Sequence, residues 1–251
     1  MLNSKWRVVK TEKRNGFENM ALDEAVSEAV AKGESPNTIR FFRWRPSTVT
    51  IGYFQSLREE VSVENCLARG FDVVRRITGG GAVYHDENGE ITYSVIARAD
   101  SFPKDLTETY KIIGQWIIDS LAELNLQAEF HPINDILVNN KKISGNAQTR
   151  RNGVMHQHGT ILFDVDVDTM FSLLKVSDIK IKDKIIKTVK ERVTSIKQNS
   201  NATEKQLEQA LIKGFTKEKE FEFGKWSKGE MQRMQELAEQ KYSSREWNYW
   251  R

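Results

Sequence analysis

The sequence predicts an α+β protein in which a mixed or antiparallel sheet is flanked by helices. Strand-like apolar runs dominate the middle of the chain, whereas helical patterns are grouped at its start and end. The chain has 251 residues, of which 39% are hydrophobic, so it can bury a sizeable core without disulfides. The 29% of charged residues and the mean hydropathy of −0.57 predict a heavily ionised surface.

Composition excludes several classes of protein. The single cysteine, Cys66, excludes an internal disulfide and a zinc site built from several cysteines. No apolar run approaches the roughly 20 residues that span a bilayer, and residues 1–16 lack the apolar stretch of a signal peptide. We therefore expect a cytoplasmic globular protein. Its net charge of +3 gives no reason to expect a nucleic-acid partner, and no membrane contact is expected either.

The first half of the chain alternates between helical and strand-like patterns. Residues 19–32 are expected to form a helix, because apolar residues recur at helical spacing between a capping Asn19 and a terminating Gly33. The next expected elements are strands at 38–44, 48–53 and 71–77 and a short helix at 62–69.

The second half begins with the sheet and ends with helices. A strand is expected at 90–97, and residues 104–124 have the clearest helical periodicity in the chain. Two strands at 135–149 and 153–164 follow, joined at Asn152-Gly153, where both residues tolerate the positive φ of a tight turn. From about residue 167 onward the pattern is mostly helical.

Three consecutive glycines follow an apolar strand, in the run Arg75-Arg76-Ile77-Thr78-Gly79-Gly80-Gly81-Ala82-Val83-Tyr84-His85-Asp86. Glycines let a backbone approach a ligand closely and leave N–H groups free to point at an anion. Because Arg75 and Arg76 alternate across a strand, one of them can face the same cavity and bind phosphate or carboxylate. The spacing matches neither a Walker loop nor a dinucleotide-binding fingerprint. A plain glycine-rich hairpin with surface arginines is the alternative interpretation.

Polar residues also follow the glycine run, in Asn134-Asp135-Ile136-Leu137-Val138 and in Lys141-Lys142-Ile143-Ser144-Gly145-Asn146-Ala147. If Ile143 points to the core, strand alternation sends Lys142 to the other face together with Ser144. A lysine in a glycine-lined cleft can neutralise a phosphate and polarise a carbonyl. Taken alone, Lys142 is more simply explained as a solvated strand lysine.

Two histidines, His156 and His158, lie two residues apart on an expected strand. They therefore share a face and could bind a metal, but no third ligand is evident nearby, so no metal is assigned. A hydrolase with a Ser-His-Asp triad would lack its nucleophile elbow here, because no G-x-S-x-G is present. For His158, a structural hydrogen-bonding role and a catalytic role both stay open.

Taken together and in this order, R-R-x-x-G-G-G-A-V-Y-H-D, N-D-I, K-K-I-S-G-N-A-Q and Q-H-G-T resemble the lipoate–protein ligase A family. The resemblance covers about residues 5–200, and K-Y-x-S-x-x-W-N over Lys241–Asn248 continues it. It implies the fold shared with biotin–protein ligases and lipoyl/octanoyl transferases, a mixed-sheet domain with a bent cleft. It also implies one catalytic domain over 1–251, with 200–251 as its closing C-terminal helices.

The resemblance assigns roles to individual residues. It implies that ATP or the adenylate is held by Arg76, Gly80, Gly81, Ala82, Val83, Tyr84 and Lys142. Lys142 matches the catalytic lysine, which touches both the acyl carbonyl and the phosphate. Lipoate would contact Lys142, His85 and His158. Asn134 and Asp135 would line the same cleft.

The activity implied by the resemblance is that of a lipoate–protein ligase. Lipoate and MgATP give lipoyl-adenylate and pyrophosphate, and a lysine ε-amine of a lipoyl carrier domain then takes the lipoyl group and releases AMP. The expected cofactors are ATP and Mg²⁺, with lipoate as substrate. The expected partners are E2 subunits of 2-oxoacid dehydrogenases or the glycine cleavage H protein.

Two other functions stay open. Octanoyltransferases of the same family move a preformed acyl group without ATP, through a cysteine thioester. In the most similar branch that cysteine lies just before the segment matching Asp135, where this chain has Phe130-His131-Pro132-Ile133-Asn134 and no thiol. The missing thiol favours the ligase over this transferase. A catalytically inert lipoyl-domain-binding protein is the third possibility.

The family also suggests a missing part. Bacterial ligases of this type often carry a further C-terminal domain, and this chain ends at Arg251. We therefore expect a separate small accessory protein to complete the enzyme for the adenylation step.

Overall fold

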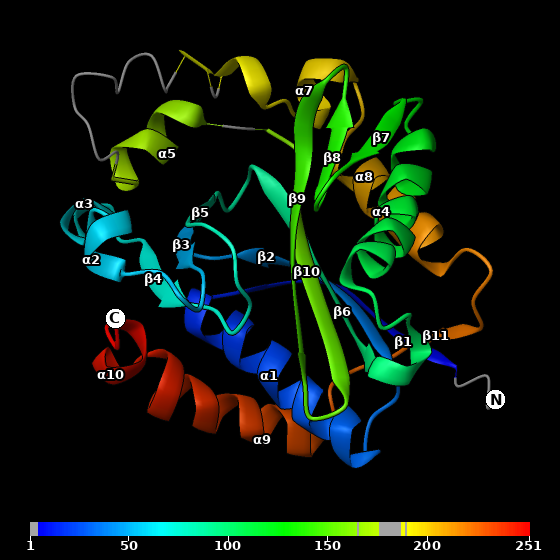
Figure 1. The fold of residues 1–251 in the computed structure, drawn as a ribbon, viewed down its shortest axis with the longest axis horizontal. Helices are drawn as coiled ribbons and strands as arrows, with labels where there is room; N and C mark the ends of the chain where they lie inside the picture. The colour runs from blue at the N-terminus through cyan, green and yellow to red at the C-terminus, as the bar shows by residue number, and fades with distance from the viewer. Residues whose placement is uncertain (1–4, 165, 176–186, 189) are drawn as a thin grey trace.

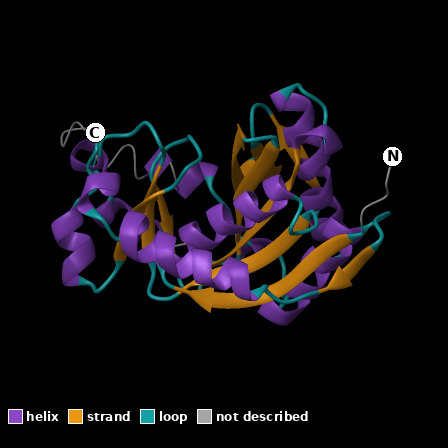
Figure 2. Ribbon diagram, turned by 90° about the horizontal axis from the view of Figure 1, so that it is seen from below, coloured by secondary structure: helices purple, strands orange, loops and turns teal. Residues whose placement is uncertain are grey.

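Two sheets form the centre of the molecule, with helices on both faces of the larger one (Figures 1 and 2). A computed structural model describes residues 5–164, 166–175, 187–188 and 190–251. The larger sheet has the spatial order β11 (Phe221–Phe223), β1 (Trp6–Arg14), β2 (Thr38–Trp44), β6 (Glu90–Arg98), β10 (Val154–Leu162), β9 (Lys141–Arg151), β8 (Asp135–Val138) and β7 (Ala128–His131). Strand β1 pairs in parallel with both neighbours, and the other pairs are antiparallel. The predicted α+β fold with a mixed sheet is therefore confirmed.

The smaller sheet consists of three short strands, β4 (Asp72–Arg75), β3 (Thr48–Ile51) and β5 (Val83–His85), in this order. Its apolar core also takes side chains from the segment of α2 (Leu57–Glu60) and α3 (Val63–Ala68) and from α5 (Val167–Leu173). Because β5 leads directly into β6, this sheet is tied to the centre of the larger one.

The larger sheet separates two hydrophobic layers. Helices α4 (Leu106–Ala122) and α8 (Glu204–Thr216) cover one face, and α1 (Gly16–Lys32) and α9 (Lys228–Leu237), with the following turn η3 (Ala238–Tyr242), cover the other. Strand β6 shows the alternation. Tyr93 and Val95 pack on the α4 side, whereas Ser94 points to the α1 side and donates to Asp23 of α1. The buried polar contact between Ser94 and Asp23 therefore lies on the α1 side.

The first helix starts earlier than the sequence pattern indicates. It begins at Gly16, because the Asn15 side chain accepts a hydrogen bond from the Glu18 N–H (2.8 Å) and caps the helix. The expected cap, Asn19, lies inside the helix, and its buried amide donates to the carbonyl oxygens of Arg14 and Arg43. The expected stop is confirmed, because Gly33 adopts the left-handed conformation (φ 74°).

The expected strand at 135–149 is two strands joined by a tight turn. Asn139 and Asn140 both have positive φ (51° and 61°), which asparagine tolerates better than most residues, so β8 turns back into β9. The turn at Asn152-Gly153 joins β9 to β10 as predicted, with φ of 51° and 74°. Strands β1, β7 and β11 had no clear signal in the sequence pattern.

The C-terminal part is mostly helical in the residues that the structure describes. Besides α5, α8 and α9 it contains α7 (Ile196–Asn199) and α10 (Arg245–Asn248). A short 3-10 turn, η1 (Ala99–Ser101), lies between β6 and α4. No helix in the described ranges is both long and apolar enough to cross a membrane.

Candidate active site

A cleft of about 340 Å³ contains nearly all the residues that the sequence singled out. Its lining includes ten of them: Arg76, Gly80, Gly81, Ala82, Val83, Tyr84, His85, Asn134, Lys142 and His158. Asp135 is not in the lining, but its carboxylate contacts Lys142 at the rim. Segments as far apart in sequence as β5 and β10 thus meet at one site.

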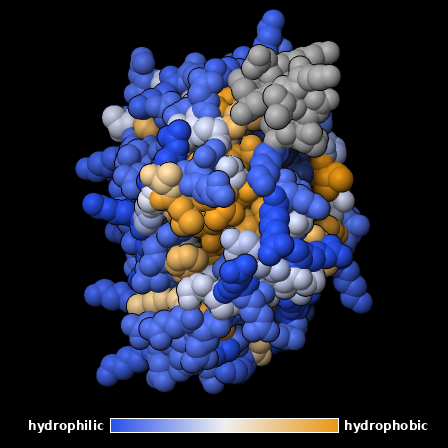
Figure 3. Space-filling view, turned by 90° about the vertical axis from the view of Figure 1, so that its left-hand side faces the viewer, coloured by the Kyte–Doolittle hydropathy of each residue, from blue (hydrophilic) through white to orange (hydrophobic). Residues whose placement is uncertain are grey.

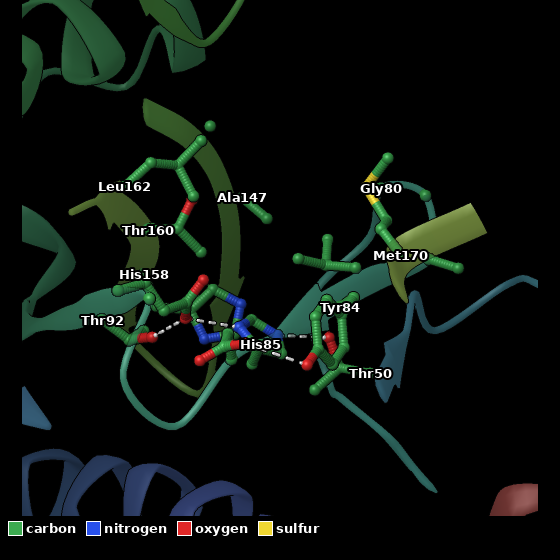
Figure 4. A pocket seen from close by; sticks show the side chains of 18 of the residues that line it. Thr50, Gly80, Tyr84, His85, Thr92, Ala147, His158, Thr160, Leu162 and Met170 are labelled. Carbon is green, nitrogen blue, oxygen red and sulfur yellow. Dashed lines mark hydrogen bonds and ion pairs between the residues drawn. The ribbon is translucent and has the colours of Figure 1, made fainter. Parts of the chain in front are cut away.

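Many of the side chains that line the cleft are apolar. The residues with apolar side chains are Met20, Trp44, Ala82, Val83, Ala147, Leu162, Met170 and Val193. Figure 4 shows Leu162 and Ala147 to one side and Met170 to the other. Figure 3 shows apolar side chains gathered in the middle of the face that carries α2, α3 and α5, with hydrophilic ones around them. A pocket of this size and character suits a medium-length acyl chain.

The glycine loop is held in shape by Arg76. Its Nη2 donates to the carbonyl oxygens of Gly79 (2.8 Å) and Gly81 (2.7 Å), and its Nη1 donates to Thr50 Oγ1 (3.0 Å). Gly80 has a φ of 96°, and a Cβ there would lie 2.9 Å from Arg76 Nη2. The loop therefore requires glycine at position 80.

The two neighbouring arginines have different environments. Arg76 lines the cleft, is 4% exposed, and burial lowers its pKa to about 10. Arg75 points away and donates to backbone carbonyls of Gly52, Tyr53, Gln55, Trp247 and Asn248, so it holds α10 against the small sheet.

Lys142 lies at the rim of the cleft as an ion pair. Its Nζ lies 2.7 Å from Asp135 Oδ1, and both side chains are partly exposed. The β8–β9 register shifts at Ile143, because Ser144 pairs with Ile136 whereas Lys142 pairs with Leu137. Lys142 therefore shares the cleft with Gly145, and Ser144 is fully buried outside it, so the expectation of a common face for Lys142 and Ser144 is wrong.

Asn134 is fixed at the cleft by a reciprocal contact with Asn146. The Asn134 Nδ2 donates to the backbone oxygen of Asn146, and the Asn146 Nδ2 donates to the backbone oxygen of Asn134 (2.7 Å). Tyr93 donates to the remaining amide oxygen of Asn146 (2.5 Å). The chain segment that leads into β8, and with it Asp135, is thereby anchored to β9.

The two predicted histidines both make buried hydrogen bonds. His85 contacts Glu90 Oε1 through Nδ1 (2.6 Å) and Thr50 Oγ1 through Nε2 (2.9 Å). His158 contacts Thr78 Oγ1 through Nε2 (2.7 Å). Burial lowers the pKa of His158 to about 4, so this imidazole is neutral at pH 7.

A third potential metal ligand does lie near the histidine pair. Atoms of Asp23, His156 and His158 lie within 4.8 Å of one another, all buried. However, the Asp23 carboxylate already accepts from Arg40 Nε (2.7 Å) and Ser94 Oγ (2.8 Å), and the Arg40 cation balances its charge. A divalent cation would add uncompensated charge beside Arg40, so we assign no metal to this group.

The chain's single thiol lies outside the cleft. Cys66 is fully buried in the apolar core of the small sheet, and burial raises its pKa to about 11. A thiol in such surroundings is a poor nucleophile.

Comparison with known proteins identifies the family. The family model described as lipoyl protein ligase A/B catalytic domain matches residues 15–216. The chain belongs to this family.

Its relatives include octanoyltransferases and ligases. The octanoyltransferase LipM of Brevibacillus brevis is 35% identical and that of Staphylococcus epidermidis 34%, each match covering 97% of this chain and 98% of the relative. Among solved structures, a bi-partite lipoate protein ligase studied with its E2 lipoyl domain from Thermoplasma acidophilum is 32% identical, with a TM-score of 0.88 over 99% of this chain and 97% of that one. A lipoate-protein ligase A bound with ATP is 29% identical, with a TM-score of 0.84 over 98% of both chains.

These relatives confirm the predicted family and fold but correct the predicted activity. The two octanoyltransferases are 35% and 34% identical to this chain, whereas the two ligases are 32% and 29% identical. The expected activity, an ATP-dependent ligase with ATP and Mg²⁺ as cofactors and an acyl-adenylate intermediate, is therefore wrong. The transferase alternative agrees with these identities better. The motifs could not separate the two activities, because an acyl carbonyl must be held and polarised in both. The expected accessory protein has no support in the two octanoyltransferases.

Two residues that support the predicted ones have no signal in the sequence. Glu90 and Thr50 line the cleft and hydrogen-bond to the predicted site residue His85. Glu90 begins a strand and Thr50 lies in an apolar run, and neither has a motif of its own. Only their contacts across two sheets reveal them.

Proposed function

We propose that this chain transfers a preformed acyl group of the octanoyl class to a lysine of a lipoyl carrier domain, without ATP. One observation carries the proposal: apolar side chains line the same cleft that has the ion pair of Lys142 and Asp135 at its rim. The names of the octanoyltransferase relatives support the acyl group and the reaction class. The E2 lipoyl domain studied with the Thermoplasma acidophilum relative supports the class of acceptor.

The proposed chemistry uses the cation and the carboxylate at the rim. The neutral ε-amine of the acceptor lysine attacks the carbonyl of an acyl thioester, and the Lys142 ammonium stabilises the oxyanion that forms. Asp135 accepts the proton that the amine loses. A carbon–nitrogen bond forms, the carbon–sulfur bond breaks, and the proton passes to the leaving thiolate.

The proposed transfer is direct, because no cysteine thiol lines the cleft in the described part of the chain. Cys66 is buried in a different core and does not line the cleft. The Thr78 hydroxyl contacts His158, but Thr78 is fully buried and does not line the cleft. The donor thioester and the acceptor amine must therefore meet in the cleft at the same time.

A competition between two acyl sources tests the proposal. The chain is given an unlabelled octanoyl thioester of an acyl carrier protein together with deuterated octanoate and MgATP, and an apo lipoyl domain as acceptor. We expect unlabelled octanoyl on the acceptor lysine. Deuterated octanoyl on that lysine would contradict the proposal, because it would show activation of the free acid by ATP.

A further inference from the structure

Arg76 is a buried cation that, among the described residues, hydrogen-bonds to three neutral groups. These groups are the Thr50 hydroxyl and the carbonyl oxygens of Gly79 and Gly81, and burial alone accounts for the lowered pKa of Arg76. A buried charge without a nearby counter-charge is costly. The structure therefore raises the question of which acidic group compensates Arg76.

A chain of buried side chains leads from Arg76 to a carboxylate. Thr50 Oγ1 accepts from Arg76 Nη1 (3.0 Å) and contacts His85 Nε2 (2.9 Å), and His85 Nδ1 contacts Glu90 Oε1 (2.6 Å). All four residues are at most 5% exposed, and all line the cleft. Figure 4 shows the contacts of Thr50, His85 and Thr92 at one side of the cleft.

The direction of the hydrogen bonds along this chain follows from chemistry. An arginine only donates, so Thr50 Oγ1 accepts there, and its own proton is free for His85 Nε2. A neutral imidazole that accepts at Nε2 carries its proton on Nδ1 and donates it to Glu90. The chain then has a cation at one end, an anion at the other, and every hydrogen bond pointing toward the anion.

Glu90 is fixed from the larger sheet. Its Oε1 also accepts from Trp44 Nε1 (3.1 Å) and Thr92 Oγ1 (2.7 Å), and the Trp44 ring stacks on His85 at 4.1 Å between centroids. Trp44 and Thr92 belong to β2 and β6, whereas Thr50 and His85 belong to the small sheet. The His85–Glu90 hydrogen bond and the stacking of Trp44 on His85 thereby join the small sheet to the centre of the larger one.

We propose that Glu90 is the remote counter-charge of Arg76 and a positioning residue of the acyl-transfer site, acting through His85 and Thr50. Its carboxylate offsets the cation that holds the glycine loop, and Asp86, Asp164 and Asp166 add further negative charge to the cleft lining. The inference rests on the proposed function in taking an eight-carbon acyl ligand for this cleft. It adds that Glu90 sets how strongly the cleft attracts a negative charge on that ligand.

A pair of matched ligands tests this role by calorimetry on the intact chain. Octanoate carries a charge and octanamide does not, while both have the same eight-carbon chain. In Glu90→Gln the amide keeps the shape and can still accept from His85, but the charge is gone. We expect octanoate to bind this variant roughly three- to tenfold more tightly than the wild type, with the octanamide affinity unchanged. A merely structural role would weaken both ligands alike.

A second pair of variants tests the connection itself. Thr50→Val removes the bridging hydroxyl, whereas Thr48→Val removes an equally buried hydroxyl of the same strand, which donates to the Pro46 carbonyl oxygen. Because the hydroxyl no longer links Arg76 to His85 and Glu90, Thr50→Val should strengthen octanoate about threefold relative to octanamide, in the same direction as Glu90→Gln. Thr48→Val should leave that ratio unchanged.

Three results would overturn the inference. The first is an octanoate affinity of Glu90→Gln that is unchanged or lowered while its octanamide affinity is unchanged. The second is an equal change of the octanoate-to-octanamide affinity ratio in Thr50→Val and Thr48→Val. The third is no binding of either ligand to the wild-type chain, which would overturn the proposed function as well. Because these are binding measurements, a failure of acyl transfer with the expected affinity shifts would contradict the proposed function alone.

Discussion

Lys142 is the single side chain on which the proposed chemistry depends most. Its ammonium lies at the rim of the cleft, 2.7 Å from Asp135, whereas the adjacent Lys141 has no predicted role. The sequence identified Lys142 because its motif resembles the family's catalytic lysine. The partners that orient the site, such as Glu90, were not identifiable, because single polar residues in apolar strands have no local pattern.

Replacing Lys142 with Ala should lower the rate of octanoyl transfer by roughly 10²–10³-fold, as expected for the loss of one oxyanion donor. The fold should persist, because this side chain is 42% exposed and contributes charge more than packing. Transfer rates and thermal melting of Lys142→Ala are measured beside those of Lys141→Ala. Equal activity of the two variants would remove Lys142 from the mechanism.

Replacing Cys66 with Ala should leave the transfer rate within about twofold of the wild type, because the thiol is buried away from the cleft. The variant should lose on the order of 1 kcal/mol of unfolding free energy from the smaller side chain. Transfer kinetics and urea unfolding check both expectations. A loss of transfer with an intact fold would indicate a thioester intermediate and argue against direct transfer.

At the scale of elements, two short segments shape the site. The glycine loop depends on the positive φ of Gly80 and on the hydrogen bonds that Arg76 donates. Helix α10 is hydrogen-bonded to β4 through Asn248 and Arg75. The sequence indicated the glycine loop but not the hydrogen bonds by which Arg76 holds it. It also placed a turn at Asn152 but missed the one at Asn139, although asparagine marks both turns.

In the glycine loop, Gly80→Ala should lower the unfolding free energy by about 1–2 kcal/mol, because alanine resists the φ of 96° and its Cβ would crowd Arg76 Nη2. Gly79→Ala is the matched control, since a Cβ there meets nothing within 4 Å. Chemical unfolding of both variants is the measurement. Similar losses in both would mean that the positive φ at Gly80 does not constrain the loop.

In α10, Asn248→Ala should cost about 2–4 kcal/mol of unfolding free energy. The buried amide accepts from the Arg75 N–H (2.7 Å) and donates to the Tyr242 and Ser244 carbonyls, and its removal leaves these groups unpaired. Glu246→Ala, on the exposed side of the same helix, should be nearly neutral. A neutral Asn248→Ala would show that α10 does not support β4.

For the whole molecule, the sequence predicted the fold class and most of the residues that the structure brings together at the cleft, but not the activity. Periodicity and turn residues determine which segments are strands, and these were sufficient for an α+β assignment. The bulge at Ile143, which puts Gly145 beside Lys142, depends on strand register and has no sequence signal. The activity was mispredicted, because the family motifs describe how an acyl group is held and not how it was activated.

A global consequence of the buried site is a pH-dependent stability. The pKa of His158 falls from 6.5 to about 4 in the folded chain, so the unfolded chain binds more protons between these values. The free energy of unfolding should therefore decrease as the pH falls from about 6.5 to 4. Thermal unfolding across this range should show a flatter profile for His158→Gln than for the exposed His131→Gln. Identical profiles would contradict the buried, neutral state of His158.

The central claim, acyl transfer without ATP, is tested most directly by the intact mass of an apo lipoyl domain. The domain is incubated with the purified chain and an octanoyl acyl carrier protein after enzymatic removal of all nucleotides. The account predicts a gain of one octanoyl group on the acceptor lysine, at a rate that added MgATP does not change. An unmodified domain under these conditions, together with modification from free octanoate and MgATP, would contradict it.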